Sequence, residues 1–173
     1  MEYYEYRNEI PLNTLKVWRD QVLATAHFQP IGWTGLPKEP YRHWAAYPKN
    51  DELYKSIFEC MNYSFKEDGF NLKPERTIVN MYNHGDSSWL HTDSEEGICW
   101  TAILFMNEYW NSNWGGDFVM VDSDGEILHA AAPTPGKFIL FRGDILHGAR
   151  PVSREAQFAR MGVAFQCIND LKM

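Results

Sequence analysis

The second half of the chain is divided by turn residues into short apolar runs, and this pattern limits the fold more than any other feature. The runs are rich in Val, Ile, Leu and Phe, and glycine, proline and aspartate separate them. Regular short strands with such turns are typical of β-sandwiches and barrels. We expect strands at 76–82, 99–106, 117–121, 126–132, 137–141, 144–147 and 158–166.

Two helices are expected before these strands. Leu15, Trp18 and Val22 recur at three- and four-residue intervals, which places them on one face of a helix. Asn13 is the predicted N-cap of this helix. A second helix is predicted over 51–67. Its apolar face consists of Leu53, Ile57, Phe58, Met61 and Phe65.

Residues 27–50 show no such periodicity and hold four prolines, two glycines and two tryptophans. Long irregular segments in compact domains are often binding loops or lids. The alternative is a covering loop that packs its aromatic side chains on the core. Residues 1–10 alternate loosely between polar and apolar and are expected to form an edge strand.

Two helices followed by a series of strands predict an α+β fold, namely a double-stranded β-helix (jelly roll) with the helices packed outside one sheet. A chain of 173 residues is expected to be one domain, and it can bury a core without disulfide or metal staples. We assign residues 1–69 to helical support and loop, and residues 70–168 to the jelly-roll core.

The charge and cysteine content exclude several classes of protein. The net charge is −7 without a basic stripe, which disfavours nucleic acid as a partner. No apolar run approaches the roughly 18 residues of a membrane span, and the acidic start MEYYE is unlike a signal peptide. Three cysteines without a CxxC pair argue against a disulfide framework and a thiolate zinc site. A cytoplasmic protein that binds no membrane is expected.

The strongest chemical signal is the sequence His91-Thr92-Asp93. Residues two apart in a strand point to the same side, so His91 and Asp93 can reach one point in space. A histidine from a distant strand would complete two imidazoles and one carboxylate on one face of a metal ion, and the opposite face stays open. That set is typical of non-haem Fe(II) oxygenases. An isolated HxD occurs often by chance, so the rest of the chain has to support this interpretation.

His147 and Arg160 provide that support. His147 ends a short apolar run after a Gly-Asp turn, and Arg160 follows on the next predicted strand. An arginine there can hold a carboxylate through two parallel hydrogen bonds. Arg150 and Arg154 are the alternatives for this task, and we expect them to be solvated charges in the connecting turn.

With these elements the sequence resembles the Fe(II)/2-oxoglutarate dioxygenases, in particular their prolyl-4-hydroxylase-like branch. The resemblance covers roughly residues 76–167, about half of the chain. It depends on five elements in the order of the family: Tyr82, His91-Thr92-Asp93, Gly115-Gly116-Asp117, His147 with Pro151-Val152, and Arg160.

The resemblance implies a role for each matching residue. His91, Asp93 and His147 would be the catalytic iron ligands, and Arg160 would bind the distal carboxylate of 2-oxoglutarate. Tyr82 would contact this cosubstrate, or else pack in the barrel. The next strand would add the hydroxyl of Thr101 to the cosubstrate site and the ring of Phe105 to the same pocket.

Two features depart from the family pattern. Some relatives have a tyrosine where this chain has Phe105, so one hydrogen bond to the distal carboxylate would be missing. Relatives often carry Ser or Thr two residues after the arginine and Trp six residues after it, whereas this chain has Gly162 and Gln166. These changes do not affect the iron ligands, but they weaken the expectation of a prolyl substrate.

The resemblance implies an enzyme that uses Fe(II), 2-oxoglutarate and O2 to hydroxylate a C–H bond, with release of succinate and CO2. Its substrate would be a peptidyl proline, another protein side chain, or a small molecule such as an amino acid. One alternative is a cupin-type metal protein that does not use 2-oxoglutarate, although cupins commonly have an HxH motif. A catalytically silent jelly-roll module is the other, but such a module would often have lost a ligand.

The remaining histidines are not expected to bind metal. We expect His27, His43 and His129 to be packed or exposed, and His84 to lie in a turn without contact to substrate. Trp89 should share the face of His91 and line either the active site or the core.

Overall fold

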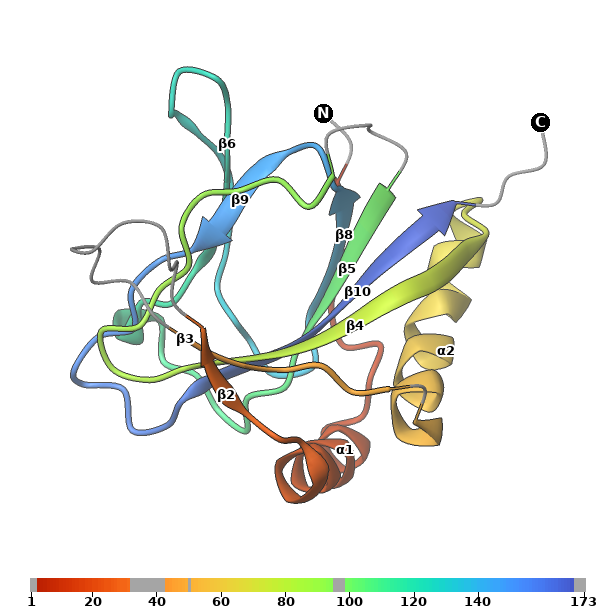
Figure 1. Cartoon of the computed structure of the whole chain (residues 1–173), viewed down its shortest axis with the longest axis horizontal. Helices are drawn as coiled ribbons and strands as arrows, with labels where there is room; N and C mark the ends of the chain where they lie inside the picture. The colour runs from red at the N-terminus through yellow and green to blue at the C-terminus, as the bar shows by residue number, and fades with distance from the viewer. Residues whose placement is uncertain (1–2, 32–42, 50, 95–98, 170–173) are drawn as a thin grey trace.

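The computed structural model describes residues 3–31, 43–49, 51–94 and 99–169. These residues form two facing antiparallel sheets (Figure 1). The larger sheet has the order β1-β8-β5-β10-β4-β3-β2 and the smaller one the order β7-β6-β9. The strands of the larger sheet are β1 (Tyr3–Tyr6), β2 (Gln29–Ile31), β3 (His43–Ala46), β4 (Leu72–Tyr82), β5 (Cys99–Phe105), β8 (Phe138–Arg142) and β10 (Arg160–Asn169). Those of the smaller sheet are β6 (Phe118–Val121), β7 (Ile127–Ala131) and β9 (Leu146–Ala149), and a short 3-10 helix, η1 (Ser112–Trp114), precedes β6.

This arrangement confirms the predicted jelly roll, and most strand boundaries agree within a few residues. The start of β4, expected at 76, lies at Leu72, and the end of β10, expected at 166, lies at Asn169. The strand β9 was expected at 144–147 and begins at Leu146. Residues 142–145 form a turn instead, closed by a 3.1 Å hydrogen bond from the Ile145 amide to the Arg142 carbonyl. The start of the predicted strand was wrong because the Gly-Asp pair is used to reverse the chain.

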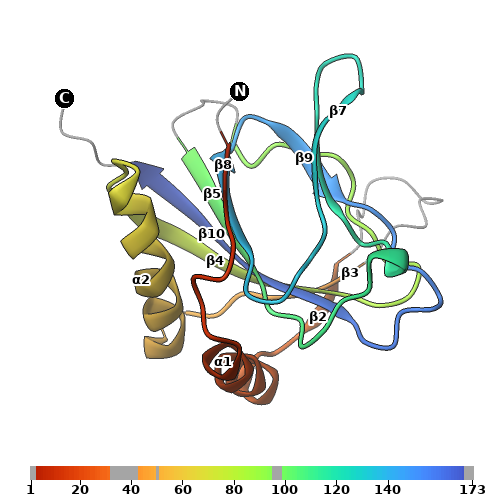
Figure 2. The same ribbon diagram turned by 180° about the vertical axis from the view of Figure 1, so that it is seen from behind.

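The two helices, α1 (Leu12–Thr25) and α2 (Glu52–Glu67), lie outside the larger sheet, on the side away from the smaller one (Figure 2). α2 begins as predicted, with the side chain of Asp51 accepting a 2.9 Å hydrogen bond from the Leu53 amide. α1 begins after Pro11 without a side-chain cap. The prediction of Asn13 as N-cap is therefore wrong, since the helix already includes the preceding Leu12.

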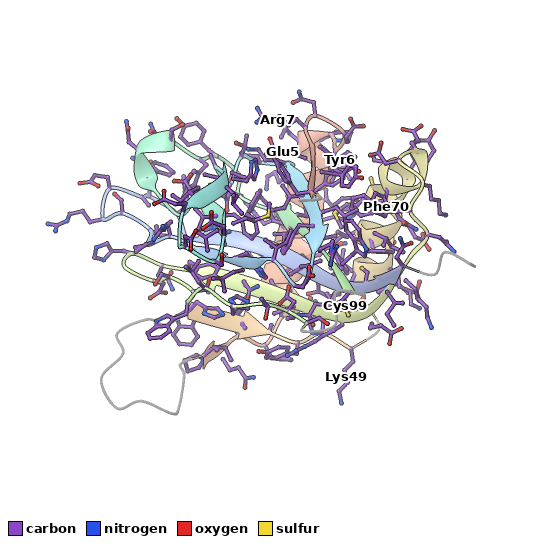
Figure 3. All side chains as sticks on the ribbon, turned by 90° about the horizontal axis from the view of Figure 1, so that it is seen from above. Glu5, Tyr6, Arg7, Lys49, Phe70 and Cys99 are labelled. Carbon is purple, nitrogen blue, oxygen red and sulfur yellow. The ribbon has the colours of Figure 1, made fainter. Side chains whose placement is uncertain are left out.

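The core between helices and sheet is aromatic and aliphatic, and it includes the predicted apolar faces of both helices. Leu15 and Val22 of α1 are buried, and so are Ile57, Met61 and Phe65 of α2. At the edge strand β1, the ring of Tyr6 stacks on Phe138 at 4.7 Å and meets Phe65 edge-on at 5.4 Å. Figure 3 shows Tyr6 and Phe70 on the side of the sheet that α2 covers.

The strand β10 shows how the sheet separates this core from the interior of the sandwich. Met161, Val163, Phe165 and Cys167 belong to the helix-side core. The alternate residues, beginning with Arg160, point into the space between the sheets because side chains alternate across a strand.

The expectation of an irregular segment at 27–50 is wrong for part of that segment. Residues 29–31 and 43–46 form the antiparallel strands β2 and β3, and β3 pairs with β4. They extend the larger sheet beside the interior space. Residues 32–42 and 50 lie outside the described residues, so a lid in this segment stays a prediction. Neither described helix has the length and apolar character needed to cross a membrane.

Candidate metal centre

His91 and His147 are brought together by the backbone. The two residues form an antiparallel bridge in which each amide donates a 2.9 Å hydrogen bond to the carbonyl of the other. Their imidazole rings consequently lie side by side, with centroids 4.5 Å apart. His147 belongs to β9, whereas His91 lies in the segment that follows β4. Two residues distant in the sequence thus become neighbours at the β9 edge of the smaller sheet.

Asp93 completes a cluster of three metal-binding side chains. Its carboxylate oxygens lie 3.7 Å from Nε2 of His91 and 3.5 Å from Nε2 of His147. One ligand atom from each residue lies within 4.8 Å of the other two. This is the set of two imidazoles and one carboxylate that the sequence predicts, and it can hold one divalent ion.

Both imidazoles are oriented for ligation. The Nδ1 atom of His91 donates a 2.7 Å hydrogen bond to the Trp89 carbonyl, and that of His147 a 2.8 Å bond to the Ile145 carbonyl. These bonds fix the tautomer that leaves Nε2 free for a metal. Burial, opposed by the nearby Asp93, lowers the pKa of His147 to about 4, so its ring is neutral near pH 7. A metal ion therefore displaces no proton from it.

Two side chains of the larger sheet hold the carboxylate of Asp93. Thr101 donates a 2.6 Å hydrogen bond to Oδ2, and Gln166 donates a 2.9 Å bond to Oδ1. Thr101 and Gln166 stand directly opposite each other in β5 and β10, so both project from the same face of the sheet. Thr101 faces the cavity, and its contact with the cosubstrate stays a prediction. The hydrogen bond from Gln166 to Asp93 was not predicted, because the sequence marks position 166 only as a departure from the family pattern.

The metal cluster lies at one end of a cavity of about 330 Å³ between the sheets. Its floor is the inner face of the larger sheet, where every second residue of β4 and β10 is exposed to the cavity. Small residues occupy the middle of the β10 row, and they leave space between the two ends of the cavity. The residues of these two strands that line the cavity are Arg76, Ile78, Asn80 and Tyr82 of β4 and Arg160, Gly162, Ala164 and Gln166 of β10.

Arg160 lines the cavity away from Gln166, at the opposite end of the row on β10. Its side chain is buried, its Nε has no hydrogen-bond partner, and no carboxylate of the described residues forms an ion pair with it. The guanidinium carbon lies 4.7 Å from the ring centre of Tyr82 and 5.3 Å from that of Phe105. Burial lowers the pKa of Arg160, although arginine stays charged at any physiological pH. The guanidinium interacts with the phenol of Tyr82 and with the charge of Asp117 but forms no ion pair, so a carboxylate that enters the cavity can supply a direct partner.

The position of Phe105 differs from the prediction that it lines the cavity. The ring is fully buried in the core between the sheets with Phe118 and Phe141, and Arg160 lies over it. Tyr82 does line the cavity, and its ring stacks on that of His43 at 4.9 Å.

The glycines of the Gly115-Gly116 turn allow the chain to pass close to this site. Both have positive φ angles, 64° and 72°. A Cβ atom on Gly116 would lie 3.2 Å from Cδ of Arg160, and one on Gly115 would lie 2.7 Å from the Pro151 carbonyl oxygen. Only glycine combines this backbone conformation with this approach. The predicted turn therefore packs directly against the arginine and the segment after β9.

Several cavity residues were not expected from the sequence. His43 lines the cavity, and burial lowers its pKa to about 4, so its ring is uncharged there. Asn80 and Arg76 precede Tyr82 by two and six residues on the same strand face. The period-two pattern of β4 could have revealed both, since Tyr82 had already been placed at the site. Tyr47 lies just beyond β3 and shows no periodic signal.

The remaining predictions concern residues outside the cavity. Trp89 is 45% exposed and lines neither the cavity nor the core. His84 is exposed, and His129 lies 3.3 Å from Glu5 at the edge of the sandwich. Arg150 and Arg154 are exposed, as expected for turn residues.

A jelly roll with two histidines and one aspartate at one end of its cavity and a buried arginine at the other is the architecture of a non-haem metal oxygenase. Residues 77–165 match the family model of the 2OG-Fe(II) oxygenase superfamily. The chain belongs to this superfamily and is a 2-oxoglutarate- and Fe(II)-dependent oxygenase. No curated protein matches the sequence.

Solved structures with the same fold include prolyl hydroxylases of low sequence identity. A Pseudomonas putida prolyl-4-hydroxylase has a TM-score of 0.71 at 18% identity, and the match covers 96% of this chain and 92% of that one. A prolyl hydroxylase from Trichoplax adhaerens, in complex with a hypoxia inducible factor peptide fragment, has a TM-score of 0.73 at 15% identity, with 96% and 83% covered. HygX from Streptomyces hygroscopicus, with nickel and 2-oxoglutarate bound, has a TM-score of 0.70 at 12% identity, with 98% and 83% covered.

Proposed function

We propose that this protein hydroxylates a C–H bond of its substrate, with His91, Asp93 and His147 as iron ligands and Arg160 as the anchor of 2-oxoglutarate. The observation that supports this assignment most strongly is the pairing of two sites in one cavity. Three ligand atoms within 4.8 Å of one another stand at one end, and a buried guanidinium without an ion pair among the described residues stands at the other. A dicarboxylate that binds metal through one end and the arginine through the other satisfies both.

Different side chains around the cavity would position the metal ligands and the cosubstrate. Iron with 2-oxoglutarate and O2 supplies the oxidising chemistry, with succinate and CO2 as products. Thr101 and Gln166 hold the carboxylate of Asp93 in one orientation, which keeps the ligand geometry fixed. Arg160 binds the distal carboxylate through its planar guanidinium, and Tyr82 packs on that guanidinium and orients it.

The floor of the cavity provides room for the cosubstrate between these two ends. Gly162 and Ala164 present almost no side chain to the space that separates Gln166 from Arg160. Thr101, His147 and Arg160 are buried, and burial strengthens the charged interactions at these side chains. We infer that residues 1–173 contribute one catalytic domain, since strands from both 1–69 and 70–168 build the sheet that carries the site.

The substrate class has two candidates. A peptidyl proline or other protein side chain is supported by the resemblance to the prolyl hydroxylases. A small molecule is favoured by the charges that line the cavity of this chain, as argued below.

The proposal is tested by adding Fe(II), and then 2-oxoglutarate, to metal-free protein without oxygen while the visible spectrum is recorded. A weak charge-transfer band that needs both additions is expected, and it should be absent from Asp93→Ala. Wild-type protein that binds another metal and gives no band would instead support the cupin-type alternative. Oxygen, with ascorbate added as the two-electron reductant that converts the second oxygen atom to water, should then convert 2-oxoglutarate to succinate and CO2 slowly even without substrate.

A further inference from the structure

Arg76 is an exposed residue that lines the cavity beside the metal centre, although no part of the proposed iron or 2-oxoglutarate site uses it. It stands directly opposite Gln166 in the pairing of β4 with β10. Gln166 in turn donates a hydrogen bond to Asp93. Neighbouring strands are about 4.8 Å apart. Only one residue therefore separates Arg76 from the carboxylate that would bind the metal.

The guanidinium of Arg76 is positioned but has no charge partner. Its central carbon lies 5.1 Å from the ring centre of Tyr47, and both side chains line the cavity. No carboxylate of the described residues forms an ion pair with it, and the adjacent Glu75 lies 3.6 Å from Lys73 instead. An arginine that rests on an aromatic ring keeps its N–H edge free for a bidentate anion.

The charges that line the cavity explain what such an arginine can bind. Among the described lining residues, Asp93 is the only carboxylate, whereas Arg76 and Arg160 are both cations. The two positive charges of Fe(II) balance the two negative charges of 2-oxoglutarate. The negative charge of Asp93 likewise balances the positive charge of Arg160. Arg76 remains as one uncompensated positive charge in a protein whose net charge is −7.

We propose that Arg76 binds the carboxylate of the substrate, and that this substrate is a small carboxylic acid such as a free amino acid. The inference rests on the proposed function and specifies its substrate. A carboxylate held by Arg76 would place carbon atoms a few bonds away close to the ligands His91, Asp93 and His147. The cavity of about 330 Å³ also has to hold 2-oxoglutarate. Its volume is at the low end of small-ligand sites, which suits a compact substrate.

The test uses pairs of compounds that differ only in the charge of one group. The Fe(II)-loaded enzyme is supplied with 2-oxoglutarate, O2 and one test compound at a time. The test compounds are the twenty free L-amino acids, their C-terminal amides and a set of short aliphatic monocarboxylic acids. Succinate formation above the substrate-free rate identifies substrates. The same compounds are titrated calorimetrically into protein loaded with Mn(II) and 2-oxoglutarate without oxygen, which measures binding independently of turnover.

We expect at least one acid to bind and to stimulate succinate formation, and its amide to bind about 10- to 100-fold more weakly, as for the loss of one charge-assisted contact. Arg76→Gln should abolish this preference of acid over amide, and Arg76→Lys should restore part of it. Arg154→Gln, which removes an exposed arginine outside the cavity, is the matched control and should retain the full preference.

Three results would overturn the inference. The first is a panel in which no acid stimulates turnover, and the second is an Arg76→Gln variant with an unchanged acid-to-amide ratio. The third is stimulation by an N-acetylated, C-amidated prolyl tripeptide but by none of the acids, which would identify a peptide substrate. Slow substrate-free succinate formation by the wild type would still support the proposed function. Its absence, together with a missing charge-transfer band, would refute that function as well.

Discussion

Replacing Gln166 by leucine and Thr101 by valine removes the two hydrogen bonds that hold Asp93 while it preserves side-chain volume. In the structure these bonds are 2.9 Å and 2.6 Å long and end on different oxygens of the carboxylate. Without them the carboxylate is free to rotate about its side-chain bonds. The orientation that faces Nε2 of both histidines is then no longer enforced.

The size of the effect follows from the type of bond. A hydrogen bond to a charged group contributes about 1.5–3 kcal/mol. A bound divalent ion withdraws charge from the carboxylate, so we take about 1.4 kcal/mol for each bond, which is a factor of about ten in Kd. Each single variant should therefore bind Fe(II) about tenfold more weakly, and the double variant about 100-fold. This range agrees with the usual cost of losing a partner of a metal ligand.

Anaerobic calorimetric titration of Fe(II) into each variant measures this directly. Thr77→Val is the matched control, since Thr77 lies on β4 but outside the cavity and should leave the Kd unchanged. Thermal unfolding of the metal-free proteins shows whether each variant is folded. A folded double variant that binds Fe(II) within twofold of the wild type would refute the idea that these two side chains fix Asp93.

Three further predictions follow from the site and the core. His91→Ala and Asp93→Ala should each abolish Fe(II) binding and succinate formation, and a fully active His91→Ala protein would disprove the ligand assignment. Arg160→Gln should raise the KM for 2-oxoglutarate about 10- to 100-fold, because a charged two-point contact is lost; an unchanged KM would exclude Arg160 as the anchor. Burial raises the pKa of Tyr54 from an ordinary value of 10.0 to about 12. The folded state keeps this proton to higher pH than the unfolded state, so the stabilisation is complete below pH 10.0 and is lost as the pH rises to about 12. Tyr54→Phe should flatten this decline in urea unfolding measured across that window, and an equally steep decline in both proteins would contradict the assignment.

Much of the local structure was predictable because it depends on short sequence periods. The apolar positions of 51–67 recur at helical intervals, and the helix forms with Ile57, Met61 and Phe65 buried. The two-residue spacing predicted that His91 and Asp93 reach one point, and they do, although the expected strand is wrong because only an isolated bridge forms at His91. The position of His147 after a Gly-Asp turn indicated the third ligand. A period of two or 3.6 residues acts within one element, so the sequence itself expresses it.

The sequence did not reveal which side chains meet across strands. Phe105 was expected to line the cavity, and it lies in the core beneath Arg160 instead. His43 was expected to be packed or exposed, and its place in the cavity lining was not predicted, because it depends on β3 extending the larger sheet. Both outcomes depend on how strands are ordered and how their termini are placed in space.

By itself, the sequence determined the jelly-roll class, the three candidate iron ligands and Arg160 as the candidate cosubstrate anchor. Only the tertiary structure decided that Gln166 lies between Thr101 and Arg76, where it contacts Asp93 on one side of the cavity. The physical reason is register. The residue pattern within a strand sets the face of the sheet on which a side chain lies. The neighbours of that side chain are set by pairing between segments far apart in the chain. The contacts around the carboxylate therefore come from β4, β5 and β10 together, and no single segment of the sequence contains them.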